Sequence, residues 1–212
     1  MISERIFGCV VLGILTIVTA RSAAAVESGL YADLDIGQAK YPYSALVDLH
    51  GVTLRSVDVP IKGTSWGATV GYRFAPYFGS EVGYVNFGKA SPPVANAPEP
   101  GATQGAARFT SAGATVALVG AVQVGNLEAF LRVGYLFAHA DLSVAAVDGP
   151  TKLNTTVTAN TLAPFGGLGF RYAFDDFWHV KIEFDRYDDV GDAARTGAAN
   201  INVATLGVGC RF

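Results

Sequence analysis

The feature of this sequence that most restricts its fold is an alternation of side-chain character with a period of two residues. Residues 178–185 (WHVKIEFD) place large apolar side chains at every second position and polar or charged side chains between them. Because successive side chains of a β-strand point to opposite faces, this segment predicts a strand with one apolar and one charged face. Similar alternation recurs along the chain, whereas helical periodicity is almost absent. An all-β fold is therefore expected.

Eight alternating segments are recognisable, and the connections between them differ in length. Three connections are short, and they alternate strictly with four long ones that are polar or rich in Pro and Gly. Short turns at one end and long loops at the other are typical of transmembrane β-barrels. The predicted strands cover residues 30–36, 64–74, 79–88, 108–122, 127–142, 158–174, 177–187 and 200–212. The predicted short turns are 75–78, 123–126 and 175–176, and the predicted long loops are 38–62, 89–107, 143–157 and 188–199.

The two faces of these strands indicate which side is enclosed. In residues 66–74 (WGATVGYRF) one face is apolar, and the other carries glycine, threonine and arginine. Glycine is unusual at solvent-facing strand positions, and adjacent charged positions cannot line a dry core without a large desolvation cost. We therefore expect the apolar faces to meet lipid and the small and charged faces to line a closed barrel, since backbone groups in lipid must be paired within the protein. A soluble lipocalin-like barrel with its apolar faces inward is the alternative.

The expected fold is thus an eight-stranded antiparallel up-and-down transmembrane β-barrel, with short periplasmic turns and long extracellular loops. Charged residues make up 16% of the chain, against about a quarter in typical soluble domains. No apolar stretch reaches the roughly 20 residues that a spanning helix needs. Cys210 is the only cysteine of the predicted barrel, so an intramolecular disulfide is excluded there. The sequence shows no basic face of the kind that binds nucleic acid, so nucleic acid is not expected as a partner.

The N-terminus has the pattern of a secretory signal peptide. Arg5 precedes an apolar run over residues 6–20, and Ala23, Ala24 and Ala25 provide a small-residue cleavage site. Residues 1–25 are therefore expected to be a cleaved signal peptide, and residues 26–212 are expected to form the outer-membrane β-barrel domain.

The predicted inward faces carry five basic and six acidic residues. Eight strands enclose a lumen just wide enough for side chains to fill, so these charges must pair, because an unpaired buried charge is costly. Arg73 and Glu81 are expected to oppose each other across a hairpin. The network is interpreted as a structural plug, and a gate that opens when partners switch is the alternative. The eleven residues are Asp33, Asp35, Arg73, Glu81, Glu128, Arg132, Arg171, Lys181, Glu183, Asp185 and Arg211.

Aromatic side chains gather beside the predicted short turns. Transmembrane barrels carry girdles of aromatic residues at the membrane interfaces, so these residues predict the periplasmic interface. They are Tyr72, Phe74, Tyr77, Phe78, Phe174, Phe177 and Trp178.

Two stretches resemble a known family. Residues 71–88 (GYRFAPYFGSEVGYVNFG) closely resemble the second hairpin of the OmpA-type eight-stranded barrels of Gram-negative outer membranes, and residues 204–212 (ATLGVGCRF) resemble the family's terminal strand. The resemblance implies outer-membrane integration and recognition by the barrel-assembly machinery through Phe212, Val208 and Leu206. Cys210 departs from the aromatic residue often found at its position. The peptidoglycan-binding domain of full-length OmpA is not expected in this chain.

The preferred interpretation of function is a non-enzymatic outer-membrane barrel with a structural or surface-contact role. Its lumen is expected to be plugged by side chains, with at most slow or gated permeation, since wide lumens come with more strands. The alternative is a channel for small or hydrophobic molecules that resembles OmpW, with an apolar funnel in the first long loop. We prefer to place the apolar residues of that loop on extensions of the first two strands. They are Leu46, Val47, Leu49, Val52, Leu54 and Val59.

The second alternative is a lipid-modifying enzyme similar to outer-membrane lipid A deacylases. Its candidates are His139, Asp141 and Ser143, but a strand places His139 and Ser143 roughly 13 Å apart, too far for a hydrogen bond. No catalytic, cofactor-binding or metal-binding residue is therefore assigned, and the protein is not expected to be an enzyme. The expected partners are outer-membrane lipid and lipopolysaccharide, the barrel-assembly machinery during biogenesis, and an extracellular partner contacted through the long loops.

Overall fold

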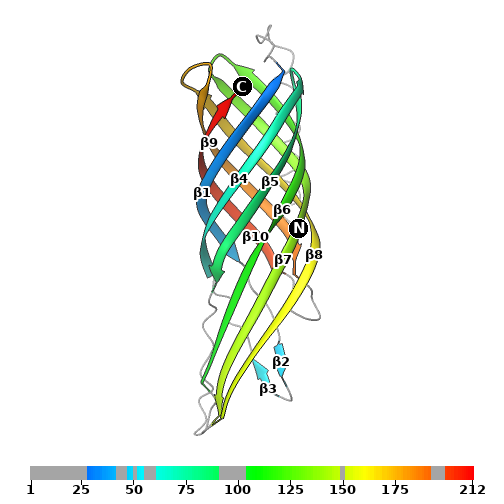
Figure 1. The fold of residues 1–212 in the computed structure, drawn as a ribbon, viewed down its shortest axis with the longest axis vertical. Helices are drawn as coiled ribbons and strands as arrows, with labels where there is room; N and C mark the ends of the chain where they lie inside the picture. Colours follow the sequence, from blue (N-terminus) through cyan, green and yellow to red (C-terminus); the bar gives the residue numbers. More distant parts are fainter. Residues whose placement is uncertain are drawn as a thin grey trace, which may run out of the picture.

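The protein forms a closed antiparallel barrel of eight strands in the order β1-β10-β9-β8-β7-β6-β5-β4 (Figure 1). The computed structural model describes residues 28–41, 47–49, 52–54, 61–90, 104–148, 151–191 and 199–212. The barrel strands are β1 (Gly29–Tyr41), β4 (Ile61–Ala75), β5 (Phe78–Ala90), β6 (Gln104–Val124), β7 (Leu127–Asp148), β8 (Thr151–Ala173), β9 (Trp178–Val190) and β10 (Ala199–Arg211). The all-β, eight-stranded architecture expected from the alternation is confirmed. The predicted signal peptide lies outside the described residues.

The first and last strands close the barrel. β1 pairs with β10 in unbroken register from Tyr31 opposite Arg211 to Lys40 opposite Asn202. The amide of Phe212 then donates a hydrogen bond to the carbonyl of Leu30 over 2.8 Å. Each end strand of the sheet is therefore paired on both sides, β1 with β10 and β4 and β10 with β1 and β9, as a sheet placed in lipid requires.

The three predicted short turns are confirmed at one end of the barrel. Gly125, between β6 and β7, has a φ of 60°, a backbone conformation that glycine adopts without steric cost. Between β8 and β9, the amides of Phe177 and Trp178 donate hydrogen bonds to Oδ1 of Asp175 over 2.8 and 2.6 Å. These bonds stabilise the ionised carboxylate, so they lower the pKa of Asp175.

One predicted long loop is wrong. Residues 143–157 were expected to be a loop, but β7 continues to Asp148 and β8 begins at Thr151. Together with β6, these strands extend well past the other five (Figure 1). The segment is rich in Val and Thr, which favour strands, so its polar residues do not mark the end of the strand.

The interpretation of the first long loop also needs correction. Val47–Leu49 (β2) and Val52–Leu54 (β3) do not extend the barrel strands, because they pair with each other as a separate two-stranded sheet. Closing a hairpin across two residues costs less chain entropy than pairing with the distant barrel strands. Leu46 and Val59 lie outside the described residues.

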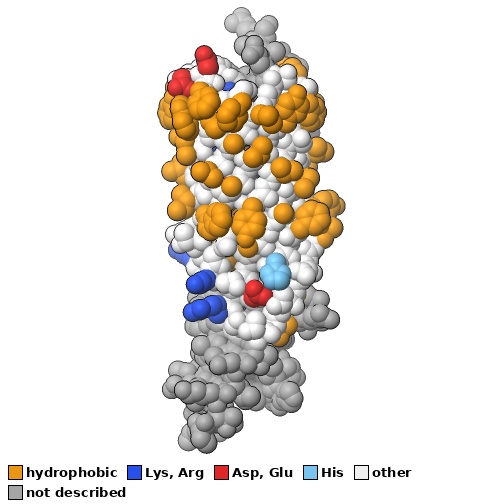
Figure 2. Space-filling view, in the orientation of Figure 1, with side chains coloured by type: hydrophobic (Ala, Val, Ile, Leu, Met, Phe, Trp, Pro, Cys, Tyr) orange, Lys and Arg blue, Asp and Glu red, His pale blue; other side chains and the backbone are white. Residues whose placement is uncertain are grey.

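On the face drawn in Figure 2, apolar side chains spread over a broad band of the barrel, with a belt of large side chains at each edge of the band. The belt beside the short turns contains the seven aromatic residues singled out above, all of them exposed. A second belt lies toward the other end, and the sequence analysis missed it. Its exposed members include Trp66 and Tyr84, whose ring centroids lie 5.6 Å apart, and Phe137 and Leu162, which are cross-strand partners. Among the described residues there is no helix long and apolar enough to cross a membrane.

Candidate functional site in the barrel lumen

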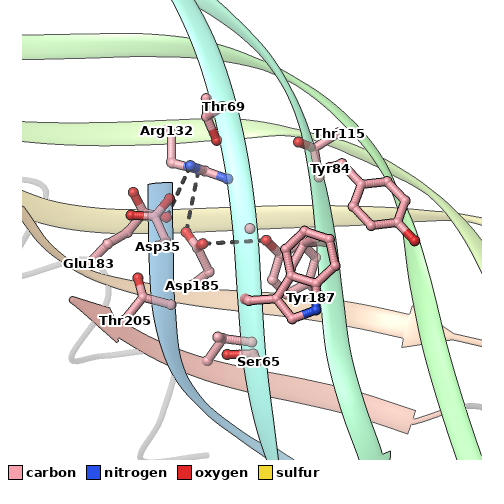
Figure 3. Close-up of a pocket in the computed structure, with 14 residues that line it drawn as sticks. Asp35, Ser65, Thr69, Tyr84, Thr115, Arg132, Glu183, Asp185, Tyr187 and Thr205 are labelled. Atoms are coloured by element: carbon pink, nitrogen blue, oxygen red, sulfur yellow. Dashed lines mark hydrogen bonds and ion pairs between the residues drawn. The ribbon is translucent and has the colours of Figure 1, made fainter. Parts of the chain in front are cut away.

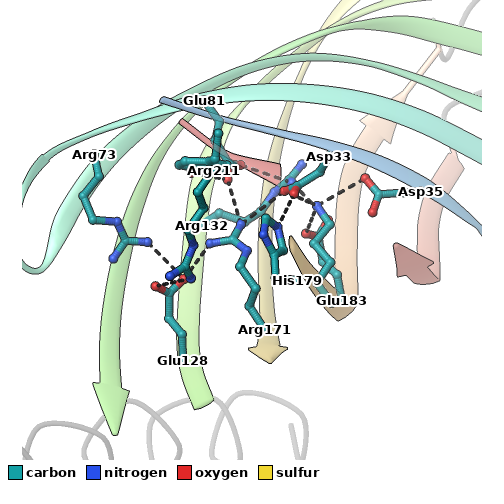
Figure 4. Close-up of polar contacts among 12 residues, drawn as sticks. Asp33, Asp35, Arg73, Glu81, Glu128, Arg132, Arg171, His179, Glu183 and Arg211 are labelled. Carbon is teal, nitrogen blue, oxygen red and sulfur yellow. Dashed lines mark hydrogen bonds and ion pairs between the residues drawn. The ribbon is translucent and has the colours of Figure 1, made fainter. Parts of the chain in front are cut away.

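The inward faces of the strands carry a continuous network of charged side chains (Figure 4). All eleven residues predicted to face the lumen contribute to it. Nine of them are buried, whereas Asp35 and Arg211 are half-buried. The network reaches across the lumen rather than only between neighbouring strands, because long side chains from opposite walls meet near the barrel axis.

At the short-turn end, three arginines converge on Glu128 of β7. Oε1 of Glu128 lies 3.0 Å from Nη2 of Arg73 and also contacts Nη1 of Arg171. Oε2 of Glu128 lies 3.6 Å from Nη2 of Arg211. The expected pairing of Arg73 with Glu81 is wrong, because Arg73 is opposite Gly79 in the register and its guanidinium crosses the lumen to β7.

In the middle layer, Asp33 of β1 receives a cation from each of two other strands. Its Oδ2 lies 3.2 Å from Nη2 of Arg171 and 3.2 Å from Nζ of Lys181, while its Oδ1 lies 2.6 Å from Nε2 of His179. His179 was not among the residues predicted to form the network, although the alternation places it on the same inward face of β9 as Lys181. Lys181 also lies 3.2 Å from Asp35.

The third layer, which is the farthest from the short turns, is centred on Arg132 of β7. Its guanidinium lies 3.0 Å from Glu183, 3.3 Å from Glu81 and 3.4 Å from Asp185. Two tyrosines complete this part of the network: Tyr31 donates a hydrogen bond to Glu81 over 2.7 Å, and Tyr187 donates one to Asp185 over 3.3 Å. These two tyrosines were also missed.

Glycines on the inward faces provide the space that the network occupies. A Cβ on Gly71 would collide with the ring of Tyr31, and a Cβ on Gly209 would collide with the carboxylate of Asp33 and the ring of His179. This explains the glycine-rich face that favoured an inverted barrel in the sequence analysis. Those positions stay small because buried charged and aromatic side chains from the adjacent strand cover them.

Toward the end where the long strands extend, the lumen changes from charged to apolar. Tyr187 packs against Phe87 and Phe165, with ring centroids 4.9 Å apart in both cases, and Tyr41 packs edge-on against Phe109 at 5.9 Å. All five side chains are buried. We call them the aromatic plug. Sequence reasoning did not identify the plug, although each member lies at the inward phase of its strand.

A small cavity of about 20 Å³ lies where the charge network meets the aromatic plug (Figure 3). Its lining includes Arg132 and Asp185 on the charged side, Tyr187 on the aromatic side, and the hydroxyl-bearing residues Thr69 and Thr115. Such a volume holds about one water molecule. The described lumen is thus filled over most of its length.

The residues weighed for catalysis lie on the outer surface instead. His139 Nδ1 lies 2.7 Å from Oδ1 of Asn160, and its Nε2 lies 3.6 Å from Oδ1 of Asp141. The hydroxyl of Ser143 lies 3.2 Å from that of Thr156. His139 and Ser143 therefore contact different partners and do not form a nucleophile–base pair. The described part of the chain contains no group of three or more His, Cys, Asp or Glu side chains arranged to hold a metal.

The predicted assembly residues Phe212, Val208 and Leu206 are exposed on the outer face of the barrel. The ring of Phe212 packs edge-on against that of Phe177, with centroids 5.7 Å apart. The last residue thus lies within the belt of aromatics beside the short turns.

Comparisons with known proteins agree with this architecture. A family model described as OmpA-like transmembrane domain matches residues 26–212. Outer membrane protein A of Serratia marcescens is 27% identical over 148 residues, which is 69% of this chain and 38% of the relative. Outer membrane protein A of Shigella dysenteriae is 24% identical over 202 residues, which is 92% of this chain and 51% of the relative. The chain therefore spans about half or less of these curated relatives.

Two solved structures share the fold at low sequence identity. The outer membrane protein OprG from Pseudomonas aeruginosa has a TM-score of 0.57 and 16% identity, and the alignment covers 90% of this chain and 99% of that one. Neisserial surface protein A has a TM-score of 0.54 and 15% identity, with coverage of 87% and 98%. With the family match spanning the whole barrel, this chain belongs to the OmpA-like transmembrane domain family of outer-membrane β-barrel proteins.

Proposed function

We propose that the protein is a non-enzymatic barrel of the Gram-negative outer membrane with a structural or surface-contact role. The observation that carries the proposal is the filled lumen, in which the charge network and the aromatic plug meet and leave a cavity of only about 20 Å³ at their junction. In this role the barrel is a rigid support that holds the extended ends of strands β6, β7 and β8 outside the outer leaflet.

Permeation is expected to be slow or gated. An ion crossing the lumen would have to displace buried partners such as Arg171 and Glu128, and breaking a buried ion pair costs several kcal/mol. The filled lumen therefore gives no support to an OmpW-like channel. The separation of His139 from Ser143 likewise gives none to a lipid A deacylase-like enzyme.

Three kinds of partner fit this role. The exposed apolar band suits outer-membrane lipid, including lipopolysaccharide. The exposed terminal residues Phe212, Val208 and Leu206 suit recognition by the barrel-assembly machinery. The elements beyond the membrane suit contact with a partner outside the cell.

Two measurements on the whole protein test the proposal. In the outer-membrane fraction, we expect boiled and unboiled samples to migrate differently on an SDS gel, because a closed barrel resists unfolding by SDS at room temperature. In planar bilayers, we expect the folded protein to show no steady conductance. A soluble protein without a mobility shift would overturn the membrane assignment, and a large steady conductance would overturn the filled-lumen role.

A further inference from the structure

Four exposed basic side chains lie on the outer face of four neighbouring strands, at the end opposite the short turns. They are Lys40 of β1, Lys62 of β4, Lys89 of β5 and Arg108 of β6. Figure 2 shows Lys and Arg side chains gathered on one side of the molecule, just beyond the second apolar belt. We call these four residues the basic row.

The strand register makes the basic row contiguous. Lys40 and Lys62 are direct cross-strand partners, and such partners have Cβ atoms about 5 Å apart. The backbone of Lys89 lies beside Gly63, the residue next to Lys62. Lys89 is opposite Thr110, and Arg108 is two residues before Thr110 on the same face. The four charges thus follow one line across the strands.

No described acidic side chain pairs with the basic row. Elsewhere on the outer face, Arg186 is neutralised by Asp188 at 2.8 Å. The acidic residue nearest in the register, Asp141, accepts a hydrogen bond from Thr158 over 2.6 Å and lies 3.6 Å from His139. Like charges directly opposite each other, as at Lys40 and Lys62, are destabilising. The row is therefore arranged to favour an anion from outside.

The position of the basic row relative to the apolar belt indicates the class of that anion. Lys40 is four residues along the same face from Ile36, and Lys62 is four residues along the same face from Trp66. The side chain of Ile36 is 61% exposed and that of Trp66 is 50% exposed. Basic side chains directly above an apolar, aromatic belt are at the depth of lipid head groups. Apolar surface and positive charge are continuous on β1 and β4, which suits a molecule with acyl chains and an anionic head.

We propose that the basic row binds the phosphate groups of an outer-leaflet lipid whose acyl chains lie against Ile36 and Trp66. Lys and Arg are the side chains that bind phosphate by charge-assisted hydrogen bonds. A soluble polyanion would use the charges but not the apolar surface below them. The inference deepens the proposed function and rests on it, since it requires the barrel to span the outer membrane.

The test uses the folded protein in detergent, titrated with lipid A and with lipid A stripped of its phosphates. We expect the wild type to bind the phosphorylated form at least tenfold more tightly, because each basic residue near an anionic surface contributes a factor of about five. The row variant K40Q/K62Q/K89Q/R108Q is expected to lose that preference. A control variant with the same net charge removes four other basic residues and is expected to keep it: R55Q/K152Q/R186Q/R195Q.

Several outcomes would overturn the inference. Equal binding by the row variant and the wild type is one, and an equal loss in the charge-matched control is another, since it would reduce the effect to net charge. Binding of soluble dextran sulfate that depends on the row, without any preference for phosphorylated lipid A, would assign the row to soluble polyanions instead. The gel-mobility shift on boiling checks that each variant is folded, and the double variant K40Q/K62Q replaces the row variant if that variant fails to fold. Failure of the wild type in the mobility assay would overturn the proposed function, whereas failure in the lipid titration alone would overturn only this inference.

Discussion

Single residues in the lumen are matched to one another across strands. Gly71 is small because the ring of Tyr31 covers it, and Tyr31 in turn is held by its hydrogen bond to Glu81 and by Arg171, whose guanidinium lies 4.6 Å from the ring centroid. A change at one such position therefore disturbs both a packing contact and an ion pair.

Replacing Gly71 with Val is expected to destabilise the barrel by about 1–3 kcal/mol, because the added side chain collides with a buried tyrosine that cannot move freely. Urea unfolding of the protein in lipid vesicles would measure the change. Gly120→Val is the matched control, since a Cβ at Gly120 comes no closer than 4.0 Å to another residue's atoms. Equal destabilisation by both variants would contradict the packing argument.

Replacing Arg171 with Met is expected to cost about 3 kcal/mol or more, because it leaves Glu128 and Asp33 with fewer cations in a buried site. The exposed pair Arg186–Asp188 provides the comparison, and Arg186→Met is expected to cost about 1 kcal/mol or less. The same unfolding measurement applies. An Arg171 variant as stable as the wild type would show that the network does not stabilise the barrel.

At the scale of elements, the strands fall into a membrane-spanning part and an extension beyond it. The exposed apolar residues of β7 run from Leu127 to Phe137, close to the 9–11 residues that a tilted strand needs to cross a bilayer. Beyond Phe137 the outer face of β7 and β8 turns polar, with His139, Asn160 and Asp141 in contact. The extension is therefore expected to be separable from the barrel.

Deleting residues 144–155 and joining Ser143 to Thr156 through Asn-Gly should leave the barrel intact, because Ser143 and Thr156 are cross-strand partners and a two-residue turn preserves their register. Mobility on unboiled gels is expected to be unchanged. The same operation between Phe137 and Leu162, also partners, removes the buried Ala138, Ala140 and Ala159 and is expected to abolish the folded band. A folded band lost in both deletions would show that the extension is needed for folding.

The end of β10 is an element with a proposed role in assembly rather than in stability. Phe212 is 73% exposed, so replacing it with Ala is expected to lower the amount of barrel assembled in the outer membrane while leaving the unfolding midpoint of purified protein nearly unchanged. Quantifying folded protein in membrane fractions alongside urea unfolding separates the two effects. Phe177→Ala removes the ring that packs on Phe212 and serves as the control; an equal loss of assembly there would assign the effect to the aromatic belt.

At the scale of the whole molecule, two barriers to permeation lie one after the other along the lumen. The charge network closes the half beside the short turns, and the aromatic plug closes the other half. Arg132 joins them, because its guanidinium pairs with Glu183 and also lies 5.0 Å from the ring centroid of Phe165.

Truncating Phe87 and Phe109 to Ala is therefore expected to leave conductance in planar bilayers at the wild-type level, since the charge network remains closed. Combining these changes with Arg171→Ala and Glu128→Ala is expected to produce a measurable conductance, because large side chains are then removed from both the charge network and the aromatic plug. The mobility shift on boiling confirms that each variant is a closed barrel. Steady conductance from the aromatic truncation alone would contradict the series arrangement.

The sequence by itself determined the eight strands of the barrel, the closure of the barrel and the alternation of side chains in those strands between lumen and lipid. The reason is that a period of two is a local property, and the covalent alternation of Trp178 and His179 already separates the lipid face from the lumen face. Composition led to a wrong prediction at residues 143–157, where polar residues were taken as a loop although the two strands continue.

Only the tertiary structure decided which inward side chains meet. Arg73 was expected beside Glu81 on the neighbouring strand but contacts Glu128 across the lumen, and Phe87 meets Tyr187 from a distant strand to form part of the aromatic plug. These contacts depend on the register of every strand pair and on the lengths of side chains that cross the axis, neither of which is a local property of the sequence. The basic row has the same origin, because Lys40, Lys62, Lys89 and Arg108 become neighbours only when four strands are aligned.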